Sequence, residues 1–358
     1  MASLPLWLTL LIFIAAAAAV WVAGVSLSNQ TDVLSTRLHL GAALGGTVLL
    51  AVATNLPEIA ITVSAALSGN TGVAVGNILG GIAIQTVVLV ALDAFGVKGD
   101  RPLMHRAASL GLVINGGLVI AVLAVVVAAT QLPDDLVVAR VAPGGLLIAV
   151  IWVVGLLLLQ RASKDLPWHA AGEAPDNQAA PRGHSTTENE AKATRKGTTT
   201  KKAALVFSAA ALVTRVAGVV LERSGDAIAD DIGLSGVLFG ATVLAAATSL
   251  PELSTGLTSV RNGDYQLAVS DIFGGNAFLP VLFLLATLIS GKAALPQAQD
   301  TDVYLAGLGI LLTCVYLYGL IFRPKAKPLG MGVDSLLVLL LYALGIAGLF
   351  AIAQAQSQ

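Results

Sequence analysis

The chain has 358 residues, of which 56% are hydrophobic and 11% charged, and its formal net charge is −1. Soluble domains carry about 25% charged residues, so this composition indicates a polytopic helical membrane protein. The charge balance gives no indication of nucleic-acid binding, and the single cysteine, Cys314, excludes an internal disulfide and a cysteine-based metal site.

Apolar runs long enough to cross a bilayer recur along the whole chain. The first run lacks a positively charged start, so we expect it to be a membrane span and not a signal peptide. The longest break, 161–202, is rich in Lys, Arg, Thr and Pro, has no apolar period and is predicted to be a disordered linker. The ten predicted spans are 4–26, 38–67, 72–97, 106–130, 137–160, 203–223, 233–260, 265–291, 302–322 and 331–353.

The distribution of basic residues predicts the orientation of these spans. Sixteen of the 20 Lys and Arg residues fall on the side of the membrane that contains the 161–202 linker. Because cytoplasmic loops are enriched in Lys and Arg, we expect this linker to be cytoplasmic and both ends of the chain to lie outside.

The two halves of the chain are similar to each other. A shift of 194 residues aligns ATNLPE (53–58) with ATSLPE (247–252), and VGNILGG (75–81) with VSDIFGG (269–275). Over 45–81 the shift gives 14 identities in 37 positions. Each half holds five spans, and because five is odd the second half must enter the membrane in the opposite orientation. We therefore expect ten transmembrane helices arranged as two inverted five-helix repeats, 1–160 and 203–358.

Each LPE motif places several oxygen atoms within about one helical turn. Proline has no N–H, so the carbonyl four residues earlier loses its helical partner. Hydroxyl or amide side chains and one glutamate accompany this freed carbonyl, and hard cations such as Ca²⁺ bind about six to eight oxygens of these kinds. The candidate ligands are Ala53, Thr54, Asn55 and Glu58 in the first motif, and Ala247, Thr248, Ser249 and Glu252 in the second.

The two glutamates have no basic residue within their own spans. An ionised carboxylate at mid-membrane costs at least about 2.5–3.5 kcal/mol, so it normally has a partner or a function. The alternative is a proline-kinked helix in which each glutamate is protonated or hydrogen-bonded. Two such motifs in register favour a cation between Glu58 and Glu252.

Two further features accompany these motifs. Gly72, Gly76 and Gly80 recur every four residues, which favours close helix packing over direct ion ligation. Asp271 occupies the repeat position of Asn77 and adds a third acidic residue. It is predicted either to stand at a helix end near the inner surface or to line the cavity.

At these residues the sequence resembles the calcium/cation antiporter superfamily, in the branch of prokaryotic sodium/calcium exchangers. The resemblance rests on the regions 46–85 and 240–279, in which each LPE motif is followed by GNILGGIAIQ or SDIFGGNAFL. It implies ten helices in the plasma membrane, with cation sites at mid-membrane and the first and sixth helices sliding against the rest. The transported ions would be Ca²⁺ and Na⁺ or H⁺, with no cofactor, and the partners would be the bilayer and inorganic cations.

The sequence departs from the family pattern at four positions. The family serine is replaced by Gly81 and Gly275, and its terminal Asn or Asp by Gln85 and Leu279. We keep Gln85 and Asp271 as candidate ligands.

Three functions are consistent with these motifs. The first is exchange of Ca²⁺ for Na⁺, and the second is exchange of Ca²⁺ for H⁺ on the same fold. The third is a transport-impaired homologue that acts as a scaffold or sensor. An intramembrane hydrolase is not favoured, because the chain has no G-x-S-x-G or H-E-x-x-H motif and no histidine within an apolar run.

Overall fold

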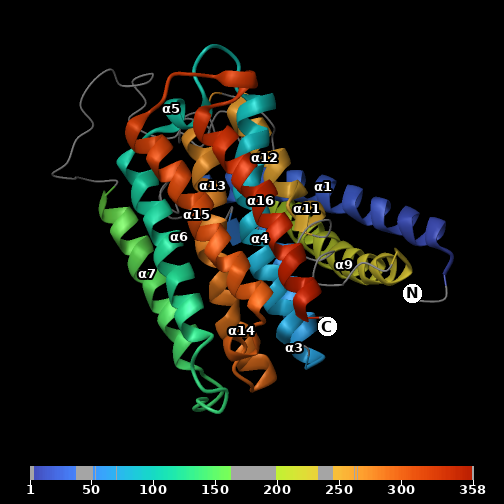
Figure 1. Ribbon diagram of the computed structural model, residues 1–358. Coiled ribbons are helices and arrows are strands. Elements are labelled where there is room, and N and C mark those ends of the chain that lie inside the picture. The colour runs from blue at the N-terminus through green and yellow to red at the C-terminus, as the bar shows by residue number, and fades with distance from the viewer. Residues whose placement is uncertain are drawn as a thin grey trace.

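The computed structural model is all-helical in the part of the chain that it describes (Figure 1). Within this part the only β-type pairing is an isolated bridge between Val138 and Val141. The α-helical class predicted from the sequence is therefore confirmed. The described residues are 4–37, 51–52, 54–69, 71–162, 199–232, 245–261, 263 and 265–356.

Eight helical segments among the described residues are long and apolar enough to cross a membrane, as expected of an integral membrane protein. Each matches a predicted span, although two of them run well past the predicted ends at 26 and 223. The segments are α1 (Leu6–Arg37), α4 (Thr71–Ala91) with the π-helical turn η1 (Leu92–Gly96), α6 (Leu110–Ala129), α7 (Pro143–Ala162), α9 (Thr200–Ile232), α13 (Tyr265–Phe278) with η4 (Leu279–Val281) and α14 (Leu282–Ser290), α15 (Asp300–Phe322) and α16 (Val333–Gln356).

The other two predicted spans, 38–67 and 233–260, are described only in their second parts. These parts are α3 (Leu56–Leu67), α11 (Ala245–Thr248) and α12 (Leu250–Arg261). Residues 38–50 and 233–244 lie outside the described residues, as does most of the predicted linker, 163–198. The count of ten spans therefore stays a prediction. Three short elements, α5 (Leu103–Ala107), η5 (Leu295–Gln297) and η6 (Pro328–Gly330), lie between the long helices.

Helix α4 occupies the middle of the bundle. In its span 72% of the residues are buried, against 22% in α7 and 17% in α16. Ile78, Leu79 and Ile82 of α4 belong to one large core together with Phe273 of α13 and Tyr316 of α15. The outer helices expose apolar side chains, which suits a lipid environment. The polar side chains of α4 and α13 thus stand in the most enclosed part of the molecule.

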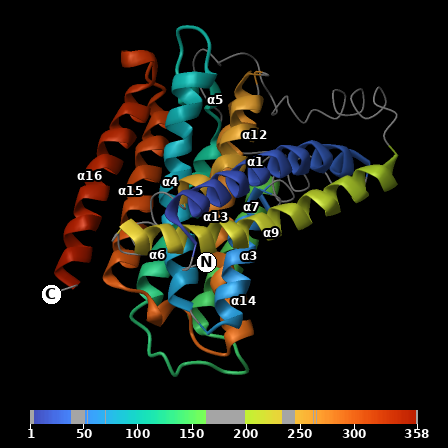
Figure 2. The same ribbon diagram turned by 90° about the vertical axis from the view of Figure 1, so that its right-hand side faces the viewer.

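Helices α1 and α9 form a separate pair. They pack along each other through small and β-branched residues such as Ala16, Val20 and Ala217. In Figure 1 the pair extends away from the bundle, and in Figure 2 it crosses the face of the bundle at a steep angle. Helix α1 also contacts α12, and α9 contacts α3. The pair therefore touches the two helices that begin with the LPE motifs.

The predicted glycine stripe of α4 packs less closely than expected. A Cβ atom at Gly72 would meet nothing within 4 Å, and one at Gly76 would lie 3.4 Å from Asp302 Oδ1. The prediction of close helix approach is therefore wrong at Gly72. That residue lies in the first turn of α4, and its Cβ direction meets no described atom within 4 Å.

Candidate functional site

Both LPE motifs interrupt a helix two residues before the proline. The interruption falls at Asn55 and at Ser249, so that α3 begins at Leu56 and α12 at Leu250. Proline cannot donate to the preceding turn, but it fits the first turn of a new helix, where its missing N–H is not needed. Each glutamate consequently lies in the first turn of a helix. There the main-chain N–H groups and the helix dipole favour negative charge.

The two glutamates are buried and face each other across the two halves. Glu58 is 0% exposed and Glu252 is 1% exposed, and the two are close enough to interact electrostatically. Each lies beside the threonine of the other motif, Glu58 beside Thr248 and Glu252 beside Thr54. The described ion pair joins Asp100 and Arg101, in the loop before α5, and neither glutamate takes part in it. No described basic side chain therefore pairs with these carboxylates.

Gln85 of α4 joins the two motifs. Its Nε2 donates a hydrogen bond to Asn55 Oδ1 at 3.1 Å and a longer one to Glu252 Oε1 at 3.5 Å. Asn55 in turn donates from Nδ2 to the main-chain oxygen of Ala51 at 2.7 Å. The side chain of Gln85 thus connects residues that are 30 and 167 positions away in the chain.

This region contains more buried acceptors than donors. Both carboxylate oxygens of Glu58, Oε2 of Glu252, Oε1 of Gln85 and Oδ1 of Asn276 are buried and accept no hydrogen bond from the described residues. The side chain of Thr248 stands beside Glu58 and interacts with its carboxylate. Buried oxygens without a donor cost free energy. The arrangement is suited to positive charge, supplied by a cation or by protons.

Asp271 adds a third carboxylate to this region. It lies in the middle of α13, is 3% exposed, and is close enough to Glu252 to interact with it. Thr255 donates to Asp271 Oδ2 at 3.2 Å and also to the main-chain oxygen of Glu252 at 3.1 Å. The prediction that Asp271 stands at a helix end is therefore wrong, and the alternative, that it lines a cavity, stays a prediction.

Three polar residues of this region were missed in the sequence. Asn276 donates from Nδ2 to Thr86 Oγ1 at 3.0 Å and to the main-chain oxygen of Ile82 at 3.5 Å. The third missed residue, after Asn276 and Thr86, is Thr255, which donates a hydrogen bond to Asp271. Their positions gave a weak signal, since Asn276 follows the Gly-Gly pair, Thr86 follows Gln85, and Thr255 comes three residues after Glu252. Periodicity alone does not separate such residues from ordinary polar residues of a helix.

The glycines that replace the family serines have different surroundings. A Cβ atom at Gly81 would lie 3.9 Å from Leu279 Cδ1, which leaves room for a side chain. One at Gly275 would lie 2.8 Å from Asn55 Nδ2 and 3.5 Å from Gln85 Oε1. Asn55 and Gln85 therefore fill the space that a serine at position 275 would need.

The contact between the α1–α9 pair and the bundle is reciprocal. Gly24 of α1 lies against Pro251 of α12, and Gly218 of α9 lies against Pro57 of α3. The 194-residue shift converts one contact into the other. A second pair of contacts is related in the same way. Gly81 lies near Leu279, and Gly275, which is 194 residues after Gly81, lies near Gln85, which is 194 residues before Leu279.

The structure brings most of the predicted site residues together. Ala247 and Ser249 are buried at the helix break of the second motif, whereas Ala53 lies outside the described residues. In the described ranges, no group of three or more His, Cys, Asp or Glu side chains is placed to hold a metal ion. A cation would therefore also need hydroxyl, amide and main-chain oxygens. The predicted residues linked by side-chain proximity are Thr54, Asn55, Glu58, Gln85, Thr248, Glu252 and Asp271.

The amino-acid sequence is related to exchangers over nearly its full length. Residues 8–160 and 202–351 match the family described as sodium/calcium exchanger protein. The inner membrane protein YrbG of Escherichia coli (strain K12) is 26% identical over 302 residues, which cover 82% of each chain. The putative antiporter CaxA of Alkalimonas amylolytica is 26% identical over 283 residues, which cover 78% of this chain and 81% of that protein.

Solved exchanger structures share the fold. The sodium-calcium exchanger NCX_Mj has a TM-score of 0.60 at 14% identity, with 96% of this chain and 99% of that chain covered. The H⁺/Ca²⁺ exchanger CAX has a TM-score of 0.63 at 13% identity, with 98% and 88% covered. At these identities the likeness concerns the fold alone. Through the family match, which extends over both halves, the chain belongs to the sodium/calcium exchanger protein family.

Proposed function

We propose that the protein is a secondary active antiporter that exchanges Ca²⁺ for Na⁺ across the plasma membrane by alternating access. The observation that carries this proposal is the excess of buried acceptor oxygens around Glu58 and Glu252. A hard cation binds such oxygens and removes the repulsion between the two carboxylates. Membership of the exchanger family supports cation exchange as the activity.

The substrate cation would be held between the two LPE motifs. Glu58 and Glu252 would supply the charge, and the neighbouring hydroxyl and amide oxygens would complete the ligand set. Gln85 would contribute Oε1, because its Nε2 is already engaged with Asn55 and Glu252. The residues of the proposed site are Ala53, Thr54, Asn55, Glu58, Gln85, Ala247, Thr248, Ser249, Glu252 and Asp271.

The proposed architecture is ten helices in two inverted repeats, 1–160 and 203–358, joined by the linker 161–202. In this arrangement residues 38–50 and 233–244 would complete the second and seventh spans. The reciprocal contacts of Gly24 with Pro251 and of Gly218 with Pro57 support the repeat. A pseudo-twofold axis explains why contacts recur after a constant shift along the chain.

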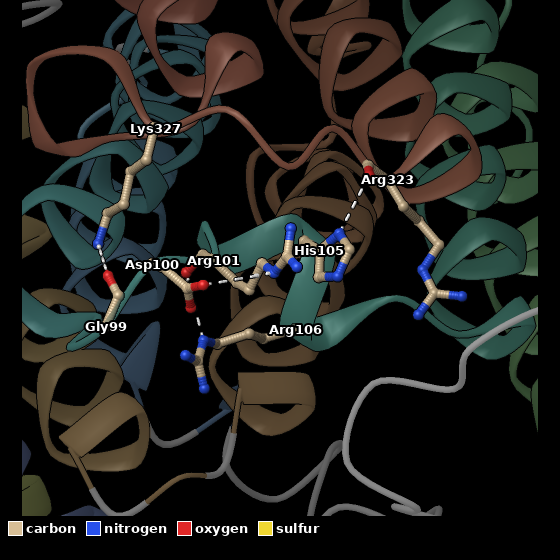
Figure 3. A network of polar contacts seen from close by, with 7 residues as sticks. All are labelled: Gly99, Asp100, Arg101, His105, Arg106, Arg323 and Lys327. Carbon is tan, nitrogen blue, oxygen red and sulfur yellow. Dashed lines mark hydrogen bonds and ion pairs between the residues drawn. The ribbon is translucent and has the colours of Figure 1, made fainter.

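The loops at one end of the bundle support the proposed orientation. Arg101, Arg106 and Lys327 gather there in one polar network (Figure 3). Because Lys and Arg are enriched in cytoplasmic loops, we assign this end to the cytoplasm. In Figure 1 α16 runs from this end of the bundle toward the opposite end, which would place its C-terminal end outside.

The α1–α9 pair would be the moving element. Glycines of the pair lie against Pro57 and Pro251, each adjacent to one of the buried glutamates. A displacement of the pair along these contacts would change the access to both glutamates together. Rigid-body motion of one unit around a fixed site is a common form of alternating access.

Flux measurements test this proposal. Purified protein in liposomes loaded with Na⁺ should take up Ca²⁺ when Na⁺ is diluted outside. Glu252→Gln and Glu58→Gln should each abolish the uptake, whereas Asp134→Asn, in an exposed loop, should leave it unchanged. Uptake that persists in Glu252→Gln would refute the site, and uptake that is insensitive to Na⁺ would refute the sodium coupling.

A second candidate, exchange of Ca²⁺ for H⁺, is favoured by the surroundings of Gln85. The amide of Gln85 is engaged with Glu252, and its repeat counterpart is the fully buried Leu279, which has no ligand atom. Fewer sites for Na⁺ remain, whereas protons need only the two glutamates, and two protons balance one Ca²⁺. The same liposomes in Na⁺-free buffer with an imposed pH gradient distinguish the two couplings.

A further inference from the structure

A second group of buried carboxylates lies toward the other end of α4. Asp93 in the turn η1 is 0% exposed, and Asp334 in the first turn of α16 is 5% exposed. Gln85, which donates to Glu252, is eight residues before Asp93, or about 12 Å along a helix. The second group is therefore separate from the proposed transport site.

Asp93 has the hydrogen-bond partners that a carboxylate anion needs. Its Oδ1 accepts from the main-chain N–H of Leu103 at 2.8 Å. Its Oδ2 accepts from the main-chain N–H of Gly332 and from Ser335 Oγ, both at 2.7 Å. These donors come from three different segments: the start of α5, the loop before α16 and the first turn of α16. Asp93 thus joins the end of α4 to the elements around it.

Asp334, unlike Asp93, has no hydrogen-bond donor for its carboxylate among the described residues. Both of its carboxylate oxygens are buried. A Cβ atom at Gly319 would collide with Asp334 Oδ2, and one at Gly332 would collide with Asp334 Oδ1. The same Cβ at Gly332 would lie 3.1 Å from Asp93 Oδ2, so the two carboxylates flank one glycine.

The hydroxyl of Tyr316 is close to the same group. Tyr316 is 0% exposed, and its hydroxyl has no hydrogen-bond partner among the described residues. It lies beside Ser335, Asp334 and Asp93. Neither aspartate forms an ion pair with a described basic residue. Two buried carboxylates and a buried hydroxyl therefore converge without a compensating charge in the described part of the chain.

We propose that Asp93, Asp334 and Tyr316 bind one divalent cation of the Ca²⁺ class at a fixed site, distinct from the transport site. All of the converging atoms are hard oxygens, which Ca²⁺ prefers, and one divalent charge balances two carboxylates. Taking two charges out of water without such compensation is strongly unfavourable. The cation would hold the ends of α4, α15 and α16 together.

The loops that surround this site are already tied to each other. Lys327 Nζ donates to the main-chain oxygens of Val97 at 2.9 Å and Gly99 at 3.4 Å, and His105 Nδ1 lies 3.0 Å from the main-chain oxygen of Arg323 (Figure 3). These contacts join the loop after η1 and α5 to the loop after α15, and Asp93 accepts from α5 and from that last loop. The contacts of Lys327 and His105 already hold these loops together, and a cation bound beneath them would strengthen the same junction.

The test uses the full-length protein with the transport site disabled. In a Glu58→Gln/Glu252→Gln background, Tb³⁺, a luminescent substitute for Ca²⁺, should bind with emission sensitised by excitation of tyrosine, and Ca²⁺ should displace it. Adding Asp334→Asn should weaken Tb³⁺ and Ca²⁺ binding about tenfold or more. Adding Tyr316→Phe should reduce the sensitised emission. Asp100→Asn, an exposed acid of the neighbouring loop, is the matched control and should change neither readout.

Thermal unfolding gives a second readout. Ca²⁺ should raise the melting temperature of the Glu58→Gln/Glu252→Gln protein, and Asp334→Asn should remove this increase. Absence of Tb³⁺ and Ca²⁺ binding in this background would overturn the proposal, and Asp334 would then hold only a proton. Binding that survives both Asp334→Asn and Tyr316→Phe would also overturn it. Since transport is already disabled, these outcomes do not depend on the proposed function.

Discussion

Gly24 of α1 lies so close to Pro251 of α12 that a Cβ atom at position 24 would stand 2.6 Å from the proline Cβ. The equivalent contact in the other half is looser, because a Cβ atom at Gly218 would stand 3.5 Å from Pro57 Cα. The two interfaces between the α1–α9 pair and the bundle are thus related in sequence but unequal in spacing. Alanine substitutions at Gly24 and Gly218 therefore form a matched pair, one at the tight contact and one at the loose contact.

Gly24→Ala should impair transport far more than Gly218→Ala. The added methyl group overlaps with Pro251, and overpacking of this kind costs about 1–3 kcal/mol. We expect Ca²⁺ flux in liposomes to fall about tenfold for Gly24→Ala. Gly218→Ala, which makes an ordinary contact, should stay close to the original flux. Equal flux in the two variants, at equal amounts of folded protein, would contradict this role of the Gly24 contact.

Gln85→Met should weaken both transport and stability. Methionine has a similar volume but cannot donate to Asn55 or Glu252, and loss of a partner for buried acceptors costs about 1–3 kcal/mol. We expect a lower melting temperature and reduced Ca²⁺ flux. Gln131→Met, at an exposed glutamine, is the control and should change neither quantity. An unaltered Gln85→Met protein would mean that the bridge between the motifs has no energetic value.

Thr255→Val should reduce the apparent affinity for Ca²⁺. The hydroxyl of Thr255 donates to Asp271 Oδ2, and valine removes this bond at nearly constant volume. A loss of about 1 kcal/mol corresponds to about a fivefold higher half-saturating Ca²⁺ concentration. Thr258→Val, which removes only a bond within α12, should stay within about twofold. A larger effect for Thr258 than for Thr255 would argue against a role of Asp271 near the cation.

Lys327→Met should loosen the junction shown in Figure 3. The ammonium group of Lys327 donates to two main-chain oxygens of the loop after η1. Because the side chain is half-buried, we expect a loss of about 1 kcal/mol and a melting temperature about 2 °C lower. Lys325→Met, at an exposed neighbour, should leave the melting temperature unchanged. An equal decrease for both variants would indicate a general effect of charge.

Much of the fold could be predicted from local patterns. Apolar runs of about 20 residues mark membrane helices whatever the tertiary structure, and eight of the predicted spans match described helices. The LPE motifs indicated where two helices are interrupted, because the effect of a proline on its own turn is local. Residues 38–50 and 233–244, outside the described part, leave the remaining two spans as predictions.

The candidate site was predictable in its chemistry and less so in its contacts. The paired glutamates and their neighbours were found because the motif occurs twice. Thr86 and Asn276 were missed, since a single polar residue in an apolar helix carries no periodic signal of its partner. The sequence allows two positions for Asp271, and only the three-dimensional arrangement of α13 and α12 excludes the helix end.

The sequence by itself determined the family, the helical class and the oxygen chemistry of two repeated motifs. The tertiary structure decided which distant residues meet: Gln85 with Glu252, Asn276 with Thr86, and Asp93 with Gly332 and Ser335. Local patterns arise from the regular geometry of a single helix. Contacts between residues 167 to 242 positions apart depend on how each helix is rotated and tilted against its neighbours, which packing of the whole bundle settles.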